Sequence, residues 1–178
     1  MKRLPGDPSR NARIEAMVRV NHAGEYGAQR IYQGQLALLG RGPVGPALRH
    51  MARQEARHLA FFESELATRR VRPTALQPLW HLAGFALGVA TAALGERAAM
   101  ACTVAVEEAI DEHYAGQLET LDGEEPKLAV AIEEFRAEEL EHRDTALAAG
   151  AQDAPAYALL YRAVNTASKL AIALSTRI

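Results

Sequence analysis

Glu139 and His142 lie three residues apart in the strongly helical run FRAEELEHRD, residues 135–144. On a helix, this spacing places both side chains on one face. The remaining positions of that face are apolar or small: Leu128, Ile132, Phe135, Ala146 and Ala149. Burying an unpaired carboxylate is costly. The pair therefore either faces water, as chance E-x-x-H pairs in Glu-rich helices do, or meets a cation inside the protein.

An internal repeat supplies partners for this pair. Glu55 and His58 form a second E-x-x-H, 84 residues earlier in the chain. The segment 25–36 aligns with the segment 107–118 at an offset of 82, and five of the twelve positions are identical. Each half of the chain therefore reads as a helix with one Glu, a turn, and a helix with E-x-x-H.

Two such hairpins predict a four-helix bundle with a pseudo-two-fold axis. One Glu from each of two helices, combined with Glu-x-x-His from each of the other two, is typical of di-iron and di-manganese carboxylate proteins. The six candidate ligands are Glu25, Glu55, His58, Glu107, Glu139 and His142. Four carboxylates balance two divalent ions, so the filled site is formally neutral and can be buried. Carboxylate and imidazole donors without thiolate favour Fe(II) or Mn(II) over a structural zinc site.

Composition indicates one all-α domain over residues 1–178. The 178 residues are enough to bury a core, and 49% of them are hydrophobic, with long runs rich in Ala, Leu, Glu and Arg. A single cysteine, Cys102, excludes an internal disulfide and indicates a reducing compartment. The first ten residues have no apolar stretch of the kind that a secretory signal requires.

Charge is distributed unevenly along the chain. Residues 107–144 carry 14 acidic side chains against 3 basic ones, whereas residues 1–106 carry 14 basic against 7 acidic. Such an acidic block repels itself unless cations or solvent screen it. The basic residues are dispersed and the chain has few aromatics, so we expect no nucleic-acid partner. Anionic lipid remains a possible partner for the basic part.

Apolar and polar patterns predict helices over residues 11–39, about 47–68 and about 126–149. Between them, a helix after Pro78 continues, straight or kinked, through Leu121. An arm at 1–10 precedes the bundle, and an amphipathic helix at 155–178 follows it. Residues 74–95 contain no charged side chain, yet offer only about 17 helical positions, a little short of a membrane span. A span there would also separate Glu25 and Glu55 from Glu107 and Glu139, so we expect an interfacial protein.

Several motifs resemble the demethoxyubiquinone hydroxylases of ubiquinone biosynthesis over nearly the whole chain. They are NHAGEYGAQRIY at 21–32, E-x-x-H at 55–58, ACTVAVEE at 101–108, HY at 113–114, EELEH at 138–142 and APAYALL at 154–160. The resemblance implies a ferritin-like four-helix bundle with additional apolar and amphipathic helices. It also implies a di-iron monooxygenase that hydroxylates demethoxyubiquinol with O2 and a reductant. The six ligand positions match those of the family one for one.

The resemblance implies further expectations. His113 and Tyr114 assist reduction or proton movement, and each chain holds two Fe ions (Fe2+/Fe3+). NADH or a reductase donates electrons. The sequence leaves open whether a lipid-binding accessory protein takes part and whether the chain forms a homo-oligomer. No mitochondrial leader precedes the motifs, which is typical of a bacterial member or of a mature form. We expect a peripheral protein on the cytoplasmic face of a bacterial inner membrane. Residues 79–94 and 157–178 are the predicted walls of an apolar substrate channel.

Two other functions share these features. A ferritin- or rubrerythrin-like iron-binding or peroxide-scavenging protein has the same six ligands but needs a polar path, which the uncharged segment disfavours. A non-enzymatic membrane scaffold uses its acidic face to recruit partners and keeps that binding without metal. Tyr32 and Tyr114 occupy matching repeat positions and either hydrogen-bond to the carboxylates or fill the core. His22 is a candidate for supporting the ligands, whereas His50 and His81 read as structural or surface residues.

Overall fold

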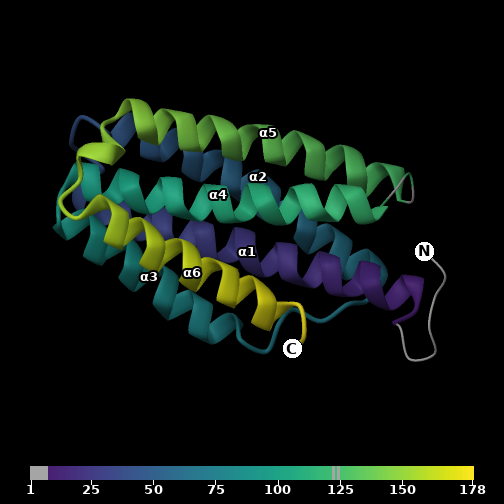
Figure 1. The fold of residues 1–178 in the computed structure, drawn as a ribbon. Helices are drawn as coiled ribbons and strands as arrows, with labels where there is room; N and C mark the ends of the chain where they lie inside the picture. The colour runs from purple at the N-terminus through teal and green to yellow at the C-terminus, as the bar shows by residue number, and fades with distance from the viewer. Residues whose placement is uncertain (1–7, 122, 124) are drawn as a thin grey trace.

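The computed structural model describes residues 8–121, 123 and 125–178, and within these ranges all regular structure is helical (Figure 1). The helices are α1 (Arg10–Leu39), α2 (Gly45–Arg69), α3 (Gln77–Ala93), α4 (Glu96–Leu121), α5 (Pro126–Ala148), the short 3-10 helix η1 (Ala151–Asp153) and α6 (Tyr157–Ser175). The all-α prediction is confirmed. Residues 1–7 of the predicted arm, together with Asp122 and Glu124 of the turn before α5, lie outside the described residues.

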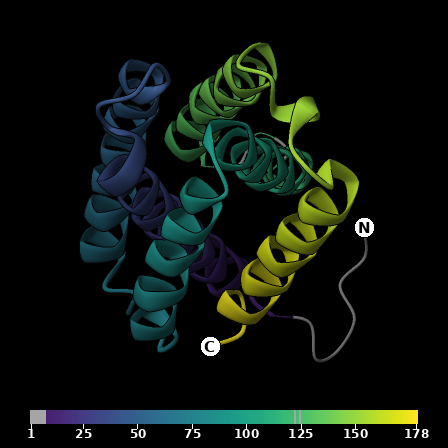
Figure 2. The same cartoon turned by 90° about the vertical axis from the view of Figure 1, so that its left-hand side faces the viewer.

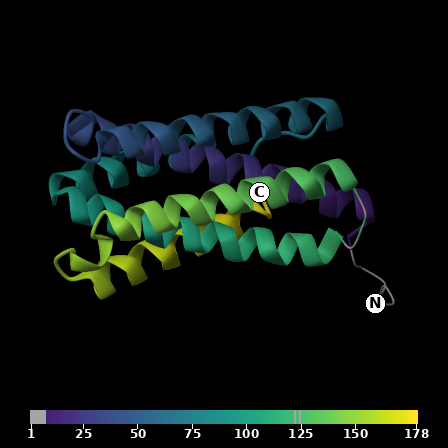
Figure 3. The same cartoon turned by 90° about the horizontal axis from the view of Figure 1, so that it is seen from above.

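The bundle consists of two helical hairpins, α1–α2 and α4–α5, whose helices run side by side along one axis (Figures 1 and 3). Helices α3 and α6 lie outside it, α3 against α1 and α6 against α4 (Figure 2). This is the predicted ferritin-like bundle with additional helices. Because α3 runs back along the molecule, the second hairpin starts at the end of the bundle where the first one turns.

Local sequence sets the helix boundaries. Ser9 caps α1 by accepting a hydrogen bond from the backbone N–H of Ala12 at 3.1 Å. Proline lies in the first turn of α2, α3 and α5, where its missing N–H costs nothing. Helix α6 begins at Tyr157, two residues after the proline that was expected to start it.

The prediction of one straight or kinked helix through Leu121 is wrong. Helix α3 ends at Ala93 and α4 begins at Glu96, with Gly95 between them at φ +111°. Residues with a side chain rarely adopt this conformation, so glycine permits the chain to reverse here. Helix α3 itself packs closely on α1. A Cβ atom at Gly88 would collide with the carbonyl oxygen of Ile31.

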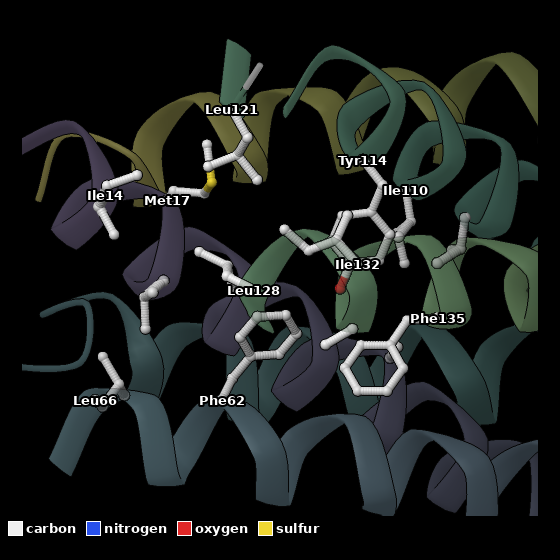
Figure 4. Close-up of a cluster of buried hydrophobic side chains, with 14 of the residues drawn as sticks. Ile14, Met17, Phe62, Leu66, Ile110, Tyr114, Leu121, Leu128, Ile132 and Phe135 are labelled. Atoms are coloured by element: carbon white, nitrogen blue, oxygen red, sulfur yellow. The ribbon is translucent and has the colours of Figure 1, made fainter. Parts of the chain in front are cut away.

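The core consists of two hydrophobic clusters. One contains Phe62, Tyr114, Leu128, Ile132 and Phe135, with side chains from all four bundle helices (Figure 4). The other contains Tyr32, Leu48, Met51, Met100, Val104 and Ala146. On α2, α4 and α5 the candidate ligands fall between the residues of these two clusters. The acidic centre is therefore enclosed by apolar packing at both ends.

Candidate metal centre

The bundle brings all six candidate ligands together. Their side chains are at most 1% exposed. Ligand atoms within 4.8 Å of one another form two overlapping groups, Glu25, Glu55, His58 and Glu139, and Glu55, Glu107, Glu139 and His142. Glu55 and Glu139 belong to both groups. The arrangement therefore offers two adjacent positions with shared carboxylates, a division of roles that the sequence did not indicate.

Several ligand atoms have no hydrogen-bond partner although they are buried. They are Glu25 Oε2, both oxygens of Glu55, Glu107 Oε2, Glu139 Oε1 and His58 Nδ1. Buried polar atoms in proteins are normally satisfied. Lone pairs that converge without donors are what a bound cation requires, so these residues fit a pair of divalent metal ions.

Both histidines present Nδ1 to the carboxylates. His58 Nδ1 lies 3.3 Å from Glu25 Oε2 and 3.2 Å from Glu139 Oε1. His142 Nδ1 lies 3.3 Å from Glu55 Oε1 and 3.1 Å from Glu139 Oε2. Their Nε2 atoms point the other way, that of His58 to Glu138 and that of His142 to Gln54. Glu138 and Gln54 were not singled out in the sequence analysis. The feature that could have identified them is their position, since each directly precedes the Glu of an E-x-x-H motif.

Two tyrosines support the carboxylates across the bundle. Tyr32 of α1 donates its hydroxyl hydrogen to Glu107 Oε1 of α4 at 2.5 Å, and Tyr114 of α4 donates to Glu25 Oε1 of α1. Of the two interpretations of these residues, hydrogen bonding to the carboxylates is confirmed. The crossed pairs also follow the pseudo-two-fold relation between the hairpins.

Without bound metal, raised pKa values keep protons on four of the six ligand residues. Burial, followed by repulsion from Glu139, raises the pKa of Glu55 well above its ordinary value and the pKa of Glu107 to about 8. Burial acts against the charge of His58, but the Glu139 and Glu25 carboxylates beside its Nδ1 outweigh the burial and raise the pKa of His58 to about 11. The pKa of His142 is also raised, because neighbouring carboxylates outweigh its burial. Metal ions must therefore displace protons from these groups.

His113 of α4 belongs to neither ligand group and instead contacts Asn21 of α1 and Gln117 of its own helix. Its Nε2 is 3.0 Å from Asn21 Oδ1 and 2.7 Å from Gln117 Nε2. Burial lowers the pKa of His113 to about 4, so the ring is neutral at neutral pH. The imidazole is packed in a polar cluster rather than solvated. The catalytic roles of His113 and Tyr114 stay predictions.

The other histidines occupy different surroundings. His22 is buried and stacks on Tyr26, with ring centroids 6.3 Å apart. Its support of the ligands stays a prediction. His81 Nδ1 lies 2.6 Å from the Tyr26 hydroxyl, and exposed His50 lies 3.5 Å from Glu141 Oε1. The structural and surface interpretations of His81 and His50 agree with these contacts.

An apolar cavity of about 160 Å³ lies between α1, α3, α4 and α6. Gly24, Ala28 and Val106 line it and are close in sequence to Glu25 and Glu107, so it approaches the ligands from the α1–α4 side. The segments predicted as channel walls contribute Trp80, Ala83, Gly84 and Leu87 from α3 and Ala167, Ser168, Ala171, Ile172 and Ser175 from α6. Trp80 Nε1 donates to Ser175 Oγ at 2.9 Å and fastens the two helices together.

The outer faces of α3 and α6 carry large exposed apolar side chains. These are Leu79, Leu82, Phe85 and Leu94 near or on α3 and Leu159 and Leu170 on α6. Among the described helices, none combines the length and the hydropathy that a membrane crossing needs. Exposed leucines and a phenylalanine on two helices that line one cavity make this side of the molecule a candidate interaction surface.

Comparison with known proteins gives a consistent result. A family model described as "Ubiquinone biosynthesis protein COQ7" matches residues 12–175. The 3-demethoxyubiquinol 3-hydroxylase of Rhodospirillum rubrum is 57% identical over 177 residues, which cover 99% of this chain and 84% of that protein. The mitochondrial NADPH-dependent 3-demethoxyubiquinone 3-hydroxylase of Homo sapiens is 52% identical over 171 residues, covering 94% and 79%. The 5-demethoxyubiquinone hydroxylase of Saccharomyces cerevisiae is 41% identical over 182 residues, covering 93% and 78%.

Proposed function

This chain belongs to the COQ7 family of ubiquinone biosynthesis proteins, and on that premise we propose that it is a di-iron monooxygenase that hydroxylates the ring of demethoxyubiquinol with O2 and a reductant. The observation that carries this proposal is the convergence of four carboxylates and two imidazoles beside an apolar cavity. The carboxylate-rich donors suit iron, and the cavity suits a hydrophobic ring.

When bound, the two irons supply the redox chemistry that activates O2 for insertion into an aromatic C–H bond. The chain's own residues prepare the site for it. Glu55 and Glu139 would each serve both metal positions, since each belongs to both ligand groups. The hydroxyl groups of Tyr32 and Tyr114 fix one oxygen of Glu107 and of Glu25, so the other oxygen of each is left for metal.

The cavity has a separate role in binding and orienting the substrate. Its lining is almost entirely apolar, so it favours the quinol ring over water and over hydrated ions. A Cβ atom at Gly24 or Gly27 would meet no atom within 4 Å, so α1 leaves open space beside Glu25. This apolar approach favours a hydroxylase over a peroxide scavenger, which takes a small polar oxidant.

The exposed leucines of α3 and α6 border the helices that line the cavity. Docking of this face on a lipid surface lets the quinol enter without crossing water, and it makes the chain a peripheral protein. We place it on the cytoplasmic face of a bacterial inner membrane. The reductant in our proposal is a reduced nicotinamide nucleotide, acting directly or through a reductase, a class that the names of several relatives support.

The direct test is a turnover assay. Iron-loaded protein receives demethoxyubiquinol, reductant and 18O2, and the product is examined by mass spectrometry. We expect a quinol heavier by one labelled oxygen atom. Consumption of peroxide without a hydroxylated product would instead support the scavenger.

A further inference from the structure

The two histidines of the centre have chemically different partners behind them. His58 Nε2 lies 2.6 Å from Glu138 Oε2, whereas His142 Nε2 lies 3.0 Å from Gln54 Oε1. Both partners accept a hydrogen bond from the Nε2–H, so each ring keeps its Nδ1 lone pair for the centre. Each partner reaches across between α2 and α5 to the histidine of the opposite hairpin. The two partners occupy equivalent positions in the two hairpins, but Glu138 is a carboxylate and Gln54 is an amide.

Glu138 is held in place as an anion. Its Oε1 accepts a hydrogen bond from Arg57 Nη2 at 2.6 Å while its Oε2 faces His58. The Glu138 side chain is 18% exposed and that of Arg57 is 55% exposed. The guanidinium thus fixes the carboxylate from the solvent side. Gln54 is 7% exposed and carries no charge.

The ligand groups themselves are matched. Each contains three carboxylates and one imidazole, and two of the carboxylates, Glu55 and Glu139, are common to both. The types of ligand therefore give no reason for the two positions to differ in metal affinity, whereas the groups behind the two histidines do. A carboxylate that accepts the Nε2–H draws the proton toward itself and increases the electron density at Nδ1. Removing such a partner typically lowers metal affinity by about 10- to 100-fold.

We propose that Glu138 makes the position held by His58 the tighter of the two metal sites, so that it fills first, while Gln54 leaves the position held by His142 weaker. Glu138 and Gln54 are positioning residues that act through the histidines. This inference rests on the metal centre of the proposed function and adds an order of filling to it.

Stepwise Co(II) titration of the metal-free protein tests the proposal, followed by visible absorption and calorimetry. We expect two resolved binding steps in the wild type. Glu138→Gln keeps the shape but removes the charge, and it should weaken the tighter step by about 10- to 100-fold. Gln54→Glu makes the reverse change and should strengthen the weaker step. Unfolding curves of each variant show whether it is folded, and the Gln54→Glu gain cannot arise from misfolding.

Single-site variants assign the steps. In His142→Ala only the His58 position keeps its imidazole, so adding Glu138→Gln should weaken the remaining site and adding Gln54→Glu should not change it. In His58→Ala the two effects should exchange. The matched control is Glu141→Gln, which removes the same charge from an exposed side chain on the same helix. It should leave both steps unchanged.

Equal effects of Glu138→Gln and Glu141→Gln on the two binding steps would overturn the proposal, and Glu138 would then be only a surface partner of Arg57. Two equal steps in the wild type would overturn it as well. Quinol hydroxylation with unaltered metal binding in Glu138→Gln would refute this inference and leave the proposed function standing. Asymmetric binding of two ions without hydroxylation would support this inference and refute the proposed function.

Discussion

The Tyr32 hydroxyl of α1 donates a hydrogen bond to Glu107 of α4, and the O···O distance is 2.5 Å. The reciprocal bond from Tyr114 of α4 to Glu25 of α1 repeats it in the other hairpin. Each tyrosine lies two turns from the Glu of its own helix and supports the Glu of the other. The centre is therefore held by hydrogen bonds between the two hairpins.

Tyr32→Phe should destabilise the metal-free protein. The substitution keeps the ring but leaves a buried carboxyl oxygen without a donor, at a cost of about 1–3 kcal/mol. Urea unfolding of the metal-free protein measures this loss. Tyr157→Phe is the control, because Tyr157 lies at the start of α6 and is only partly buried. Equal stability of the two variants would show that the Tyr32 hydroxyl contributes nothing.

The metal-free protein should lose stability as the pH rises. The pKa of Glu107 is raised from 4.5 to about 8 and that of His58 from 6.5 to about 11. Both shifts are upward, so each contribution is complete below the ordinary pKa and is lost as the pH rises through the folded-state pKa. Between pH 6.5 and about 8 both contributions decline. Thermal unfolding after chelation should show the decline, and metal-loaded protein should show a flatter profile. Parallel profiles would contradict this account.

Gly27→Leu should block substrate entry without disturbing the metal centre. Gly27 lines the apolar cavity, and a Cβ atom there would meet no atom within 4 Å. The leucine side chain would therefore occupy the cavity in which we propose that the quinol ring binds. We expect hydroxylation to fall by about tenfold or more, with metal content unchanged. Gly116→Leu places the same side chain on the exposed face of α4. Wild-type turnover in Gly27→Leu would exclude this cavity as the substrate site.

His113→Gln tests the predicted role in reduction. Because the pKa of His113 is lowered to about 4, the wild-type ring stays neutral near pH 7 and reduction should not titrate with it there. Rapid-mixing kinetics should show slower reduction of the variant by the nicotinamide nucleotide. Protein that has been chemically reduced beforehand should hydroxylate at the wild-type rate. Equal slowing of both steps would point to a structural role.

The sequence predicted which six side chains converge because the repeat carries them. Offsets of 82 and 84 residues brought Glu25, Glu107 and the two E-x-x-H pairs into correspondence, and the bundle places them together. The break at Gly95 was not predictable, since Gly84 and Gly88 in the same uncharged run are helical. Only the backbone conformation distinguishes these glycines.

The partner of His58 was hidden for a different reason. Glu138 lies in an acidic block whose members look alike in sequence, and most such acids are solvated. Its selection depends on the antiparallel register of α2 and α5, which brings it opposite His58. A repeat identifies equivalent positions, but it does not state which residues of two helices face each other.

Metal content per chain tests the central claim most directly. Metal-free protein is loaded with Fe(II) under anaerobic conditions, freed of excess iron and analysed for iron, alongside His58→Ala, His142→Ala and Glu139→Ala. We predict two ions in the wild type and one in each histidine variant, because each imidazole serves a single ligand group. Glu139→Ala should lose both, because Glu139 belongs to both groups. Two firmly bound ions in all three variants would contradict the account, since the metal would then be held elsewhere.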